Sequence, residues 1–156
     1  MAKERGMRVL AVDGRPAHLA STQEALRPLG CEVVTAASVA EAVGVLEFTK
    51  VDLVIAAVGM PDVDGLTLLR YVRENFGDLE FLMLSDHPGI DEAVQSIKAG
   101  AHDYLAAPFS QDDLRGAVQR ALDKLRQQRR AQAVDLPRRS YGIIGESGGI
   151  GRLLTG

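Results

Sequence analysis

The sequence of 156 residues has one cysteine, no tryptophan and three tyrosines. The single cysteine, Cys31, excludes an intramolecular disulfide. The scarcity of aromatic rings argues against a flavin or nucleotide enzyme, whose site would stack a ring system. None of the apolar runs approaches the ~18 residues that cross a bilayer, so no contact with a membrane is expected. The N-terminal MAKERGM lacks the apolar segment of a signal peptide, which favours a cytoplasmic location.

Charge is distributed unevenly along the chain. Residues 1–110 contain nine Lys/Arg and 16 Asp/Glu, a net charge of −7, whereas residues 111–156 contain nine and five, a net charge of +4. The acidic part argues against binding of nucleic acid by the main domain. A basic helix face beside a linker is usually solvated. We therefore expect no direct binding of nucleic acid by this chain.

Five short, continuous apolar runs alternate with segments of helical periodicity. A continuous run, unlike an alternating one, is typical of a strand that is covered on both faces. The sequence therefore predicts an α/β fold of (βα)5 type, a doubly wound parallel sheet. The runs are VLAV at 9–12, VVTA at 33–36, LVIAAV at 53–58, FLML at 81–84 and YLA at 104–106.

Capping residues mark the starts of several predicted helices. Ser38 with Glu41 forms a capping box, in which the hydroxyl accepts from a free N–H and the carboxylate reaches back. Ser110 with Asp113 repeats this pattern before the last helix, and Asp64 is the expected N-cap of the third.

Four stretches resemble the receiver domain of two-component response regulators: VLAVDGRP, DLVIAAVGMPDVDG, FLMLSD and GAHDYLAAPF. The resemblance implies a flavodoxin-like (CheY-like) sheet of order 2-1-3-4-5, with a crevice beyond the carboxyl ends of strands one and three. The family places a metal-binding acid at 14, a phospho-accepting aspartate at 57 and a lysine at 107. This chain has Gly14, Ala57 and Ala107. We interpret it as a pseudo-receiver.

The crevice that the resemblance implies lacks the groups for phosphoryl transfer. Ala57 offers no nucleophile, and Gly14 removes an oxygen ligand, so that the Asp13 carboxylate and the Gly59 carbonyl remain. No catalytic residue, metal or cofactor is expected, and His18, His87 and His102 lack metal-ligand spacing. We also expect Arg15 to pair with Asp13. The predicted crevice residues are Asp13, Gly14, Arg15, Ala57, Gly59, Ser85 and Ala107.

Nearby acids are poor substitutes for the missing aspartate. Asp62 and Asp64 follow the third apolar run, but Asp64 matches a capping position, and Asp52 precedes the run, at the opposite end of the strand. An aspartate-to-alanine replacement made in the laboratory would also leave Ala57, and Ala107 could be introduced in the same way. Gly14 and Arg15 in the same pocket favour a natural loss at position 57.

The resemblance also implies an output surface. Ser85 and Tyr104 occupy the family's switch positions, although Tyr104 also suits a plain strand and Ser85 a turn. Ala107–Pro108 resembles the family's cis peptide. We expect a homodimer that uses the surface around the fourth and fifth helices. The predicted interface residues are Tyr104, Leu114, Val118, Leu122 and Leu125.

Three segments are predicted: a receiver-like domain over 1–126, a linker over 127–141, and a new domain over 142–156. The last helix is expected to extend into the linker and to end at Pro137. The last segment, GIIGESGGIGRLLTG, resembles the entry to the AAA+ domain of NtrC-type sigma-54-dependent activators. It lacks a phosphate loop, because Ile150 and Gly151 stand where glycine and lysine are required.

The resemblance implies a regulatory module that controls the AAA+ domain of the same full-length chain, by dimerising or by contacting a regulatory protein. The alternative is a sensor module that binds a small ligand in the neutralised crevice, where Arg15 could hold an anion.

Overall fold

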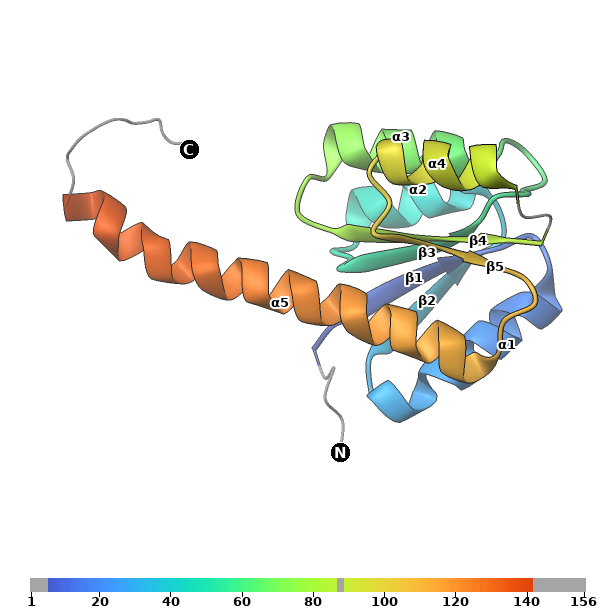
Figure 1. Ribbon diagram of the computed structural model, residues 1–156, viewed down its shortest axis with the longest axis horizontal. Coiled ribbons are helices and arrows are strands. Elements are labelled where there is room, and N and C mark those ends of the chain that lie inside the picture. Colours follow the sequence, from blue (N-terminus) through green and yellow to red (C-terminus); the bar gives the residue numbers. More distant parts are fainter. Residues whose placement is uncertain (1–5, 87–88, 142–156) are drawn as a thin grey trace. The chain divides into compact units, whose positions relative to one another are not determined.

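The computed structural model describes residues 6–86 and 89–141. The described residues form a five-stranded parallel sheet of order β2-β1-β3-β4-β5 (Figure 1). This confirms the flavodoxin-like fold and the strand order. The strands are β1 (Arg8–Val12), β2 (Glu32–Ala36), β3 (Leu53–Ala57), β4 (Glu80–Ser85) and β5 (Asp103–Ala106).

Helices cover both faces of the sheet. Figure 1 shows α1 and the first turns of α5 on one face, and α2, α3 and α4 on the other. All five residues of β3 are buried, as the continuous apolar run predicted. The helices are α1 (Pro16–Leu26), followed by a 3₁₀ turn (Arg27–Leu29), then α2 (Val39–Phe48), α3 (Gly65–Asn75), α4 (Ile90–Lys98) and α5 (Gln111–Tyr141).

The register brings the carboxyl ends of three strands to one edge. Val12 of β1 lies beside Ala36 and Ala56, and Ala57 of β3 lies beside Leu84. Because parallel strands end on the same side, the loops that follow β1, β3 and β4 meet there. This edge carries the candidate site.

The predicted helix caps are confirmed. The Ser38 hydroxyl accepts from the Glu41 amide at 3.1 Å. Ser110 and Asp113 bond reciprocally at 3.0 Å, and the Asp64 carboxylate accepts from the Thr67 amide at 3.0 Å.

The last helix corrects two predictions. It continues through Pro137 to Tyr141, so the proline does not end it; a proline removes one helical hydrogen bond and leaves the others of a long helix in place. Its apolar positions Leu114, Val118 and Leu122 are buried, 3%, 0% and 0% exposed. These residues are spaced four apart, so they form the single apolar side that an amphipathic helix packs against its own domain. They therefore belong to the domain core and are not available as an interface.

The chain divides into two compact units, of which the first ends at Asp123 and the second begins at Lys124. Leu125, the remaining predicted interface residue of this helix, is also buried. The predicted start of an AAA+ domain, 142–156, lies outside the described residues. None of the helices that the structure describes is both long and apolar enough to cross a membrane.

Candidate functional site

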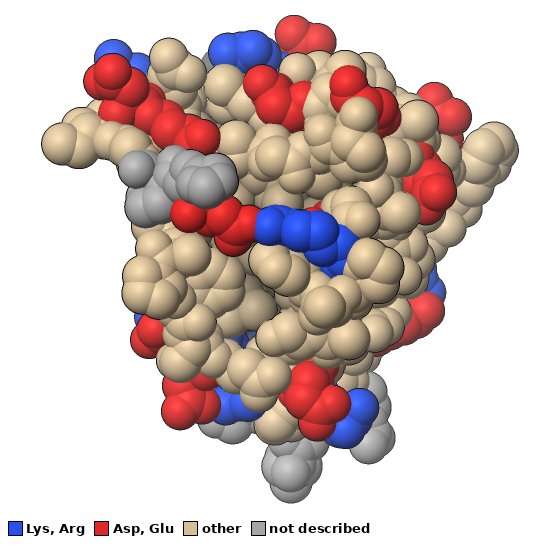
Figure 2. All heavy atoms as spheres, turned by 90° about the vertical axis from the view of Figure 1, so that its right-hand side faces the viewer, with Lys and Arg blue, Asp and Glu red and all other residues tan. Residues whose placement is uncertain are grey.

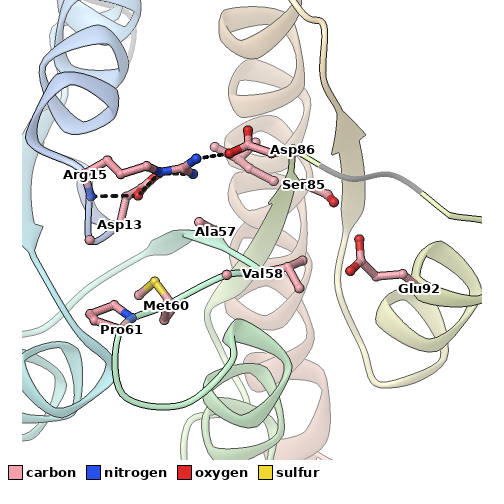
Figure 3. Close-up of a pocket in the computed structure, with 12 residues that line it drawn as sticks. Asp13, Arg15, Ala57, Val58, Met60, Pro61, Ser85, Asp86 and Glu92 are labelled. Atoms are coloured by element: carbon pink, nitrogen blue, oxygen red, sulfur yellow. Dashed lines mark hydrogen bonds and ion pairs between the residues drawn. The ribbon is translucent and has the colours of Figure 1, made fainter.

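A crevice of about 480 Å³ lies at the carboxyl ends of β1, β3 and β4. Figure 3 shows the three chain segments that form it: the loop after β1, the loop after β3, and the end of β4 with α4 beyond it. Every predicted crevice residue except Ala107 lines it. Its lining residues are Asp13, Gly14, Arg15, Ala57, Val58, Gly59, Met60, Pro61, Leu84, Ser85, Asp86 and Glu92.

Ala107 lines a second, smaller hollow of about 240 Å³, with His18, Thr22 and Phe109 among its neighbours. The two hollows share Asp13, Arg15, Leu84 and Asp86. The Ala107 amide donates to the Ser85 carbonyl at 2.8 Å, and the expected cis peptide between Ala107 and Pro108 is present. Ala107 therefore lines the hollow beside the crevice and not the crevice itself.

The charged centre of the site is Arg15. Its Nε donates to Asp13 Oδ1 at 3.0 Å and its Nη2 to Asp13 Oδ2 at 3.2 Å, which confirms the predicted pair. Its Nη1 donates to Asp86, which directly follows β4. Figure 2, which faces this edge of the sheet, shows positive and negative side chains in contact near the middle of the surface. One guanidinium thus pairs with two carboxylates from different loops, which leaves one net negative charge on the three groups.

The position that the sequence resemblance assigns to the phospho-acceptor holds a methyl group. Ala57 ends β3 at the crevice and is 3% exposed. Gly14, the position that the resemblance assigns to a second acid, is also closed: a Cβ there would lie 2.9 Å from Cδ of Pro61. The proline ring cannot swing aside as a flexible side chain would, so a longer residue at 14 requires the loop after β3 to move.

The residues present do not fit the Mg²⁺ ion that the fold family implies. Both oxygens of Asp13 accept from Arg15, and Asp86 is bonded to the same guanidinium. Among the residues that the structure describes, no group of three or more His, Cys, Asp or Glu could hold a metal. A divalent ion could bind these carboxylates only by displacing the guanidinium of Arg15.

The acids considered as substitutes for the phospho-acceptor have structural roles. Asp62 accepts from the amides of Val39 and Ala40, at 3.1 and 3.0 Å, and so caps α2 from a different loop. Asp64 caps α3. Asp52 accepts from the Arg8 amide at 2.7 Å, at the amino end of the strands. These contacts explain each acid without phosphorylation.

The cap made by Asp62 gives a pH-dependent prediction. Desolvation raises the pKa of the Asp62 carboxyl, but the backbone amides of Ala40 and Val39 outweigh it and hold the pKa below its ordinary value of 3.8. A lowered pKa in the folded state stabilises the protein above pH 3.8, and this stabilisation is lost as the pH falls through the folded pKa. Asp62→Ala should therefore lower the melting temperature (Tm) at pH 7.

The measurement is the Tm of the unmodified chain and of Asp62→Ala between pH 2.5 and 7. We expect the difference to shrink below pH 3.8. Asp78→Ala, at an exposed acid in the α3–β4 connection, is the control and should leave the Tm nearly unchanged. A difference that is constant over the whole pH range would contradict the role of the ionised carboxylate.

The two predicted switch residues lie close together. Ser85 is buried, and the half-buried Tyr104 donates its hydroxyl hydrogen to Glu92 of α4. Desolvation, followed by the Glu92 carboxylate, raises the pKa of Tyr104, and a hydrogen bond with Ser85 partly offsets this. Tyr104 therefore connects β5 and the end of β4 to α4.

Asp86, Glu92 and His18 were not predicted as site residues. Asp86 follows Ser85 at a strand end, and this position in the sequence is a signal that could have identified it. His18, in the first turn of α1, places its Nδ1 3.4 Å from Asp13 Oδ2. Glu92 could not be identified, because a single acid on a helix has no sequence signature that places it beside a distant strand.

Comparisons with known proteins agree with this geometry. The family model of the response regulator receiver domain matches residues 9–119. The DNA-binding transcriptional regulator NtrC of Escherichia coli K12 is 30% identical over 125 residues, which cover 80% of this chain and 27% of NtrC. The transcriptional regulatory protein PrrA of Mycobacterium leprae is 37% identical over 102 residues, covering 65% of this chain and 44% of PrrA. The chain thus spans less than half the length of either relative.

A solved structure gives the same result for the fold. The beryllofluoride-activated receiver domain dimer of NtrC4 superposes with a TM-score of 0.72 at 29% identity, over 76% of this chain and 98% of that chain. The crevice lies at the strand ends where the sequence resemblance places it. The chain belongs to the response regulator receiver domain family.

Proposed function

We propose that this chain is a cytoplasmic, receiver-like regulatory module that does not accept a phosphoryl group. The observation that carries the proposal is Ala57, a buried methyl group at the end of β3. Transfer of a phosphoryl group to a protein needs a nucleophile and a means to neutralise the developing charge. Ala57 lacks the first, and the engagement of Asp13 with Arg15 removes the second.

The output would be contact with another protein through α4. Ile90, Val94 and Ile97 lie at i, i+4 and i+7, on one side of this helix, and are 84%, 44% and 49% exposed. Within α4, all of which the structure describes, Ser96 is the buried residue. A helix whose apolar stripe faces solvent is suited to a protein interface. We propose that a second copy covers this stripe.

The target of regulation would be an AAA+ module of a sigma-54-dependent transcriptional activator. Two facts support this: the sequence of residues 142–156, and the 30% identity to NtrC. NtrC is about four times as long as the matched region, which leaves room for such a module. The domain would act by holding or releasing that module as a dimer, alone or with a regulatory protein.

Sedimentation equilibrium of the chain, with and without beryllofluoride and Mg²⁺, tests the proposal. We expect a dimer whose dissociation constant does not respond to beryllofluoride. Ile97→Lys should weaken it at least ~10-fold, since a charge in an apolar interface costs more than the ~1.4 kcal/mol that this factor represents. Phe48→Lys, at an 88% exposed phenylalanine on α2, is the matched control and should leave the dimer intact. A monomer that dimerises only with beryllofluoride would refute the proposal.

The second candidate is a sensor for a small ligand, which the crevice volume favours. The contacts of Arg15 weigh against an anion, because both Asp13 and Asp86 already neutralise it. A thermal-shift screen in which a compound raises the Tm of the unmodified chain but not of Met60→Trp, which would fill the crevice, would favour the sensor.

A further inference from the structure

Arg15 connects two parts of the chain that are far apart in sequence. Arg15 directly precedes α1, and Asp86, 71 residues later, directly follows β4. Figure 3 shows the guanidinium between Asp13 and Asp86, with dashed contacts to both. The Arg15 amide also donates to Asp13 Oδ1 at 3.0 Å, so its backbone and its side chain bind the same carboxylate. Hydrogen bonds therefore hold both the backbone and the guanidinium of Arg15 in place.

Burial decides how much this contact matters. Ion pairs between exposed side chains contribute little, and the side chains of Arg15 and Asp86 are 44% and 36% exposed. The side chain of Asp13, however, is only 8% exposed. A buried carboxylate must be neutralised or protonated, and removing its partner leaves an uncompensated charge. Arg15 supplies that partner with two parallel N–H donors, the arrangement that suits a carboxylate best.

We infer that Arg15 is an internal cation that takes the place of a divalent ion in this crevice and clamps the β1–α1 loop to the end of β4. The clamp holds the two loops in one arrangement without any ligand. It also disfavours Mg²⁺, since both oxygens of Asp13 and the carboxylate of Asp86 already accept from Arg15. This inference concerns Arg15 and goes beyond the proposed function, which depends on Ala57.

The test is the Tm of the unmodified chain and of Arg15→Met, measured in 10 mM MgCl₂ and in NaCl of matched ionic strength. The unmodified chain should show the same Tm in both salts. Arg15→Met should melt roughly 5–10 °C lower in NaCl and recover part of this loss in MgCl₂, because Asp13 and Asp86 can then bind the ion. Arg27→Met is the matched control: Arg27 forms an exposed pair with Glu24 at 2.9 Å, and its loss should change the Tm by less than ~2 °C in either salt.

Two further variants separate the clamp from a general effect on folding. Asp13→Asn in the Arg15→Met background removes the uncompensated charge, so the double variant should melt higher than Arg15→Met and lose its response to MgCl₂. Arg15→Lys keeps the positive charge but lacks the two parallel N–H donors of the guanidinium. Its Tm should therefore not respond to MgCl₂ and should lie between that of the unmodified chain and that of Arg15→Met.

Three results would overturn the inference. The first is a Mg²⁺-dependent rise in the Tm of the unmodified chain. The second is an Arg15→Met variant that matches Arg27→Met in both salts. The third is a double variant no more stable than Arg15→Met. Each leaves the proposal for Ala57 standing, because that rests on a missing nucleophile rather than on the clamp.

Discussion

Gly65→Ala is expected to destabilise the domain by about 3 kcal/mol, the upper end of the cost of overpacking, and to lower its Tm by roughly 10 °C. Gly65 begins α3, and a Cβ there would lie 2.2 Å from the Ala57 carbonyl oxygen and 3.0 Å from its carbon. The Gly65 amide donates to the Val58 carbonyl at 2.7 Å, which holds the helix start against the end of β3. The new methyl group must push the strand end or the helix away.

Gly44→Ala is the matched control for this substitution. Gly44 lies inside α2, and a Cβ there meets no atom within 4 Å. Alanine should therefore stabilise that helix by ~1 kcal/mol, the cost of an interior glycine. Denaturant unfolding of the two variants should give changes of opposite sign. Equal changes, or a Gly65→Ala variant as stable as the unmodified chain, would show that β3 and α3 are not in this close contact.

Ala57→Asp is expected to destabilise the domain by about 3 kcal/mol at pH 7 and not to restore phosphorylation. Position 57 is 3% exposed and lines the same crevice as Asp13, so the new carboxylate would be buried close to an existing one. Burial and a nearby negative charge both raise the pKa of a carboxyl group. The penalty therefore applies above the ordinary pKa of aspartate and disappears in acid, where the group is protonated in both states.

Ala57→Asn is the control, because it has the same shape without the charge. The two variants should have equal Tm values near pH 3 and differ at pH 7, with the aspartate variant less stable. The second readout is the intact mass after incubation of Ala57→Asp with acetyl phosphate and Mg²⁺. We expect no phosphoryl adduct, since Gly14 supplies no ligand and Arg15 occupies Asp13. Stoichiometric phosphorylation would show that the side chain at position 57 alone prevents phosphorylation of the unmodified chain.

Local sequence patterns were sufficient for the fold and for most of the crevice. Each continuous apolar run became a strand within one residue. Burial on both faces explains the pattern in β1, β3 and β4, whereas the edge strands β2 and β5 are partly exposed. The capping residues Ser38, Asp64 and Ser110 were also predictable, since a cap is made within four residues of the chain. The family resemblance then placed the strand ends and their missing groups.

Contacts between distant segments could not be predicted in this way. The bond from Arg15 to Asp86 and that from Tyr104 to Glu92 depend on how two loops and a helix meet, which no local pattern encodes. The exposed stripe of α4 is the clearest case. Periodicity alone would direct Ile90 and Val94 toward the core, whereas the structure buries Ser96 and leaves the apolar side outside.

Amide NMR spectra of the unmodified chain, with and without Mg²⁺ and beryllofluoride, test whether this receiver domain uses phosphorylation. Beryllofluoride mimics a phosphoryl group on a carboxylate. We expect unchanged signals for Asp13, Ser85 and Tyr104 at saturating additions. Saturable shifts that spread from the crevice to Tyr104 would refute a domain independent of phosphorylation, because they would require another acid to have taken the place of the missing nucleophile.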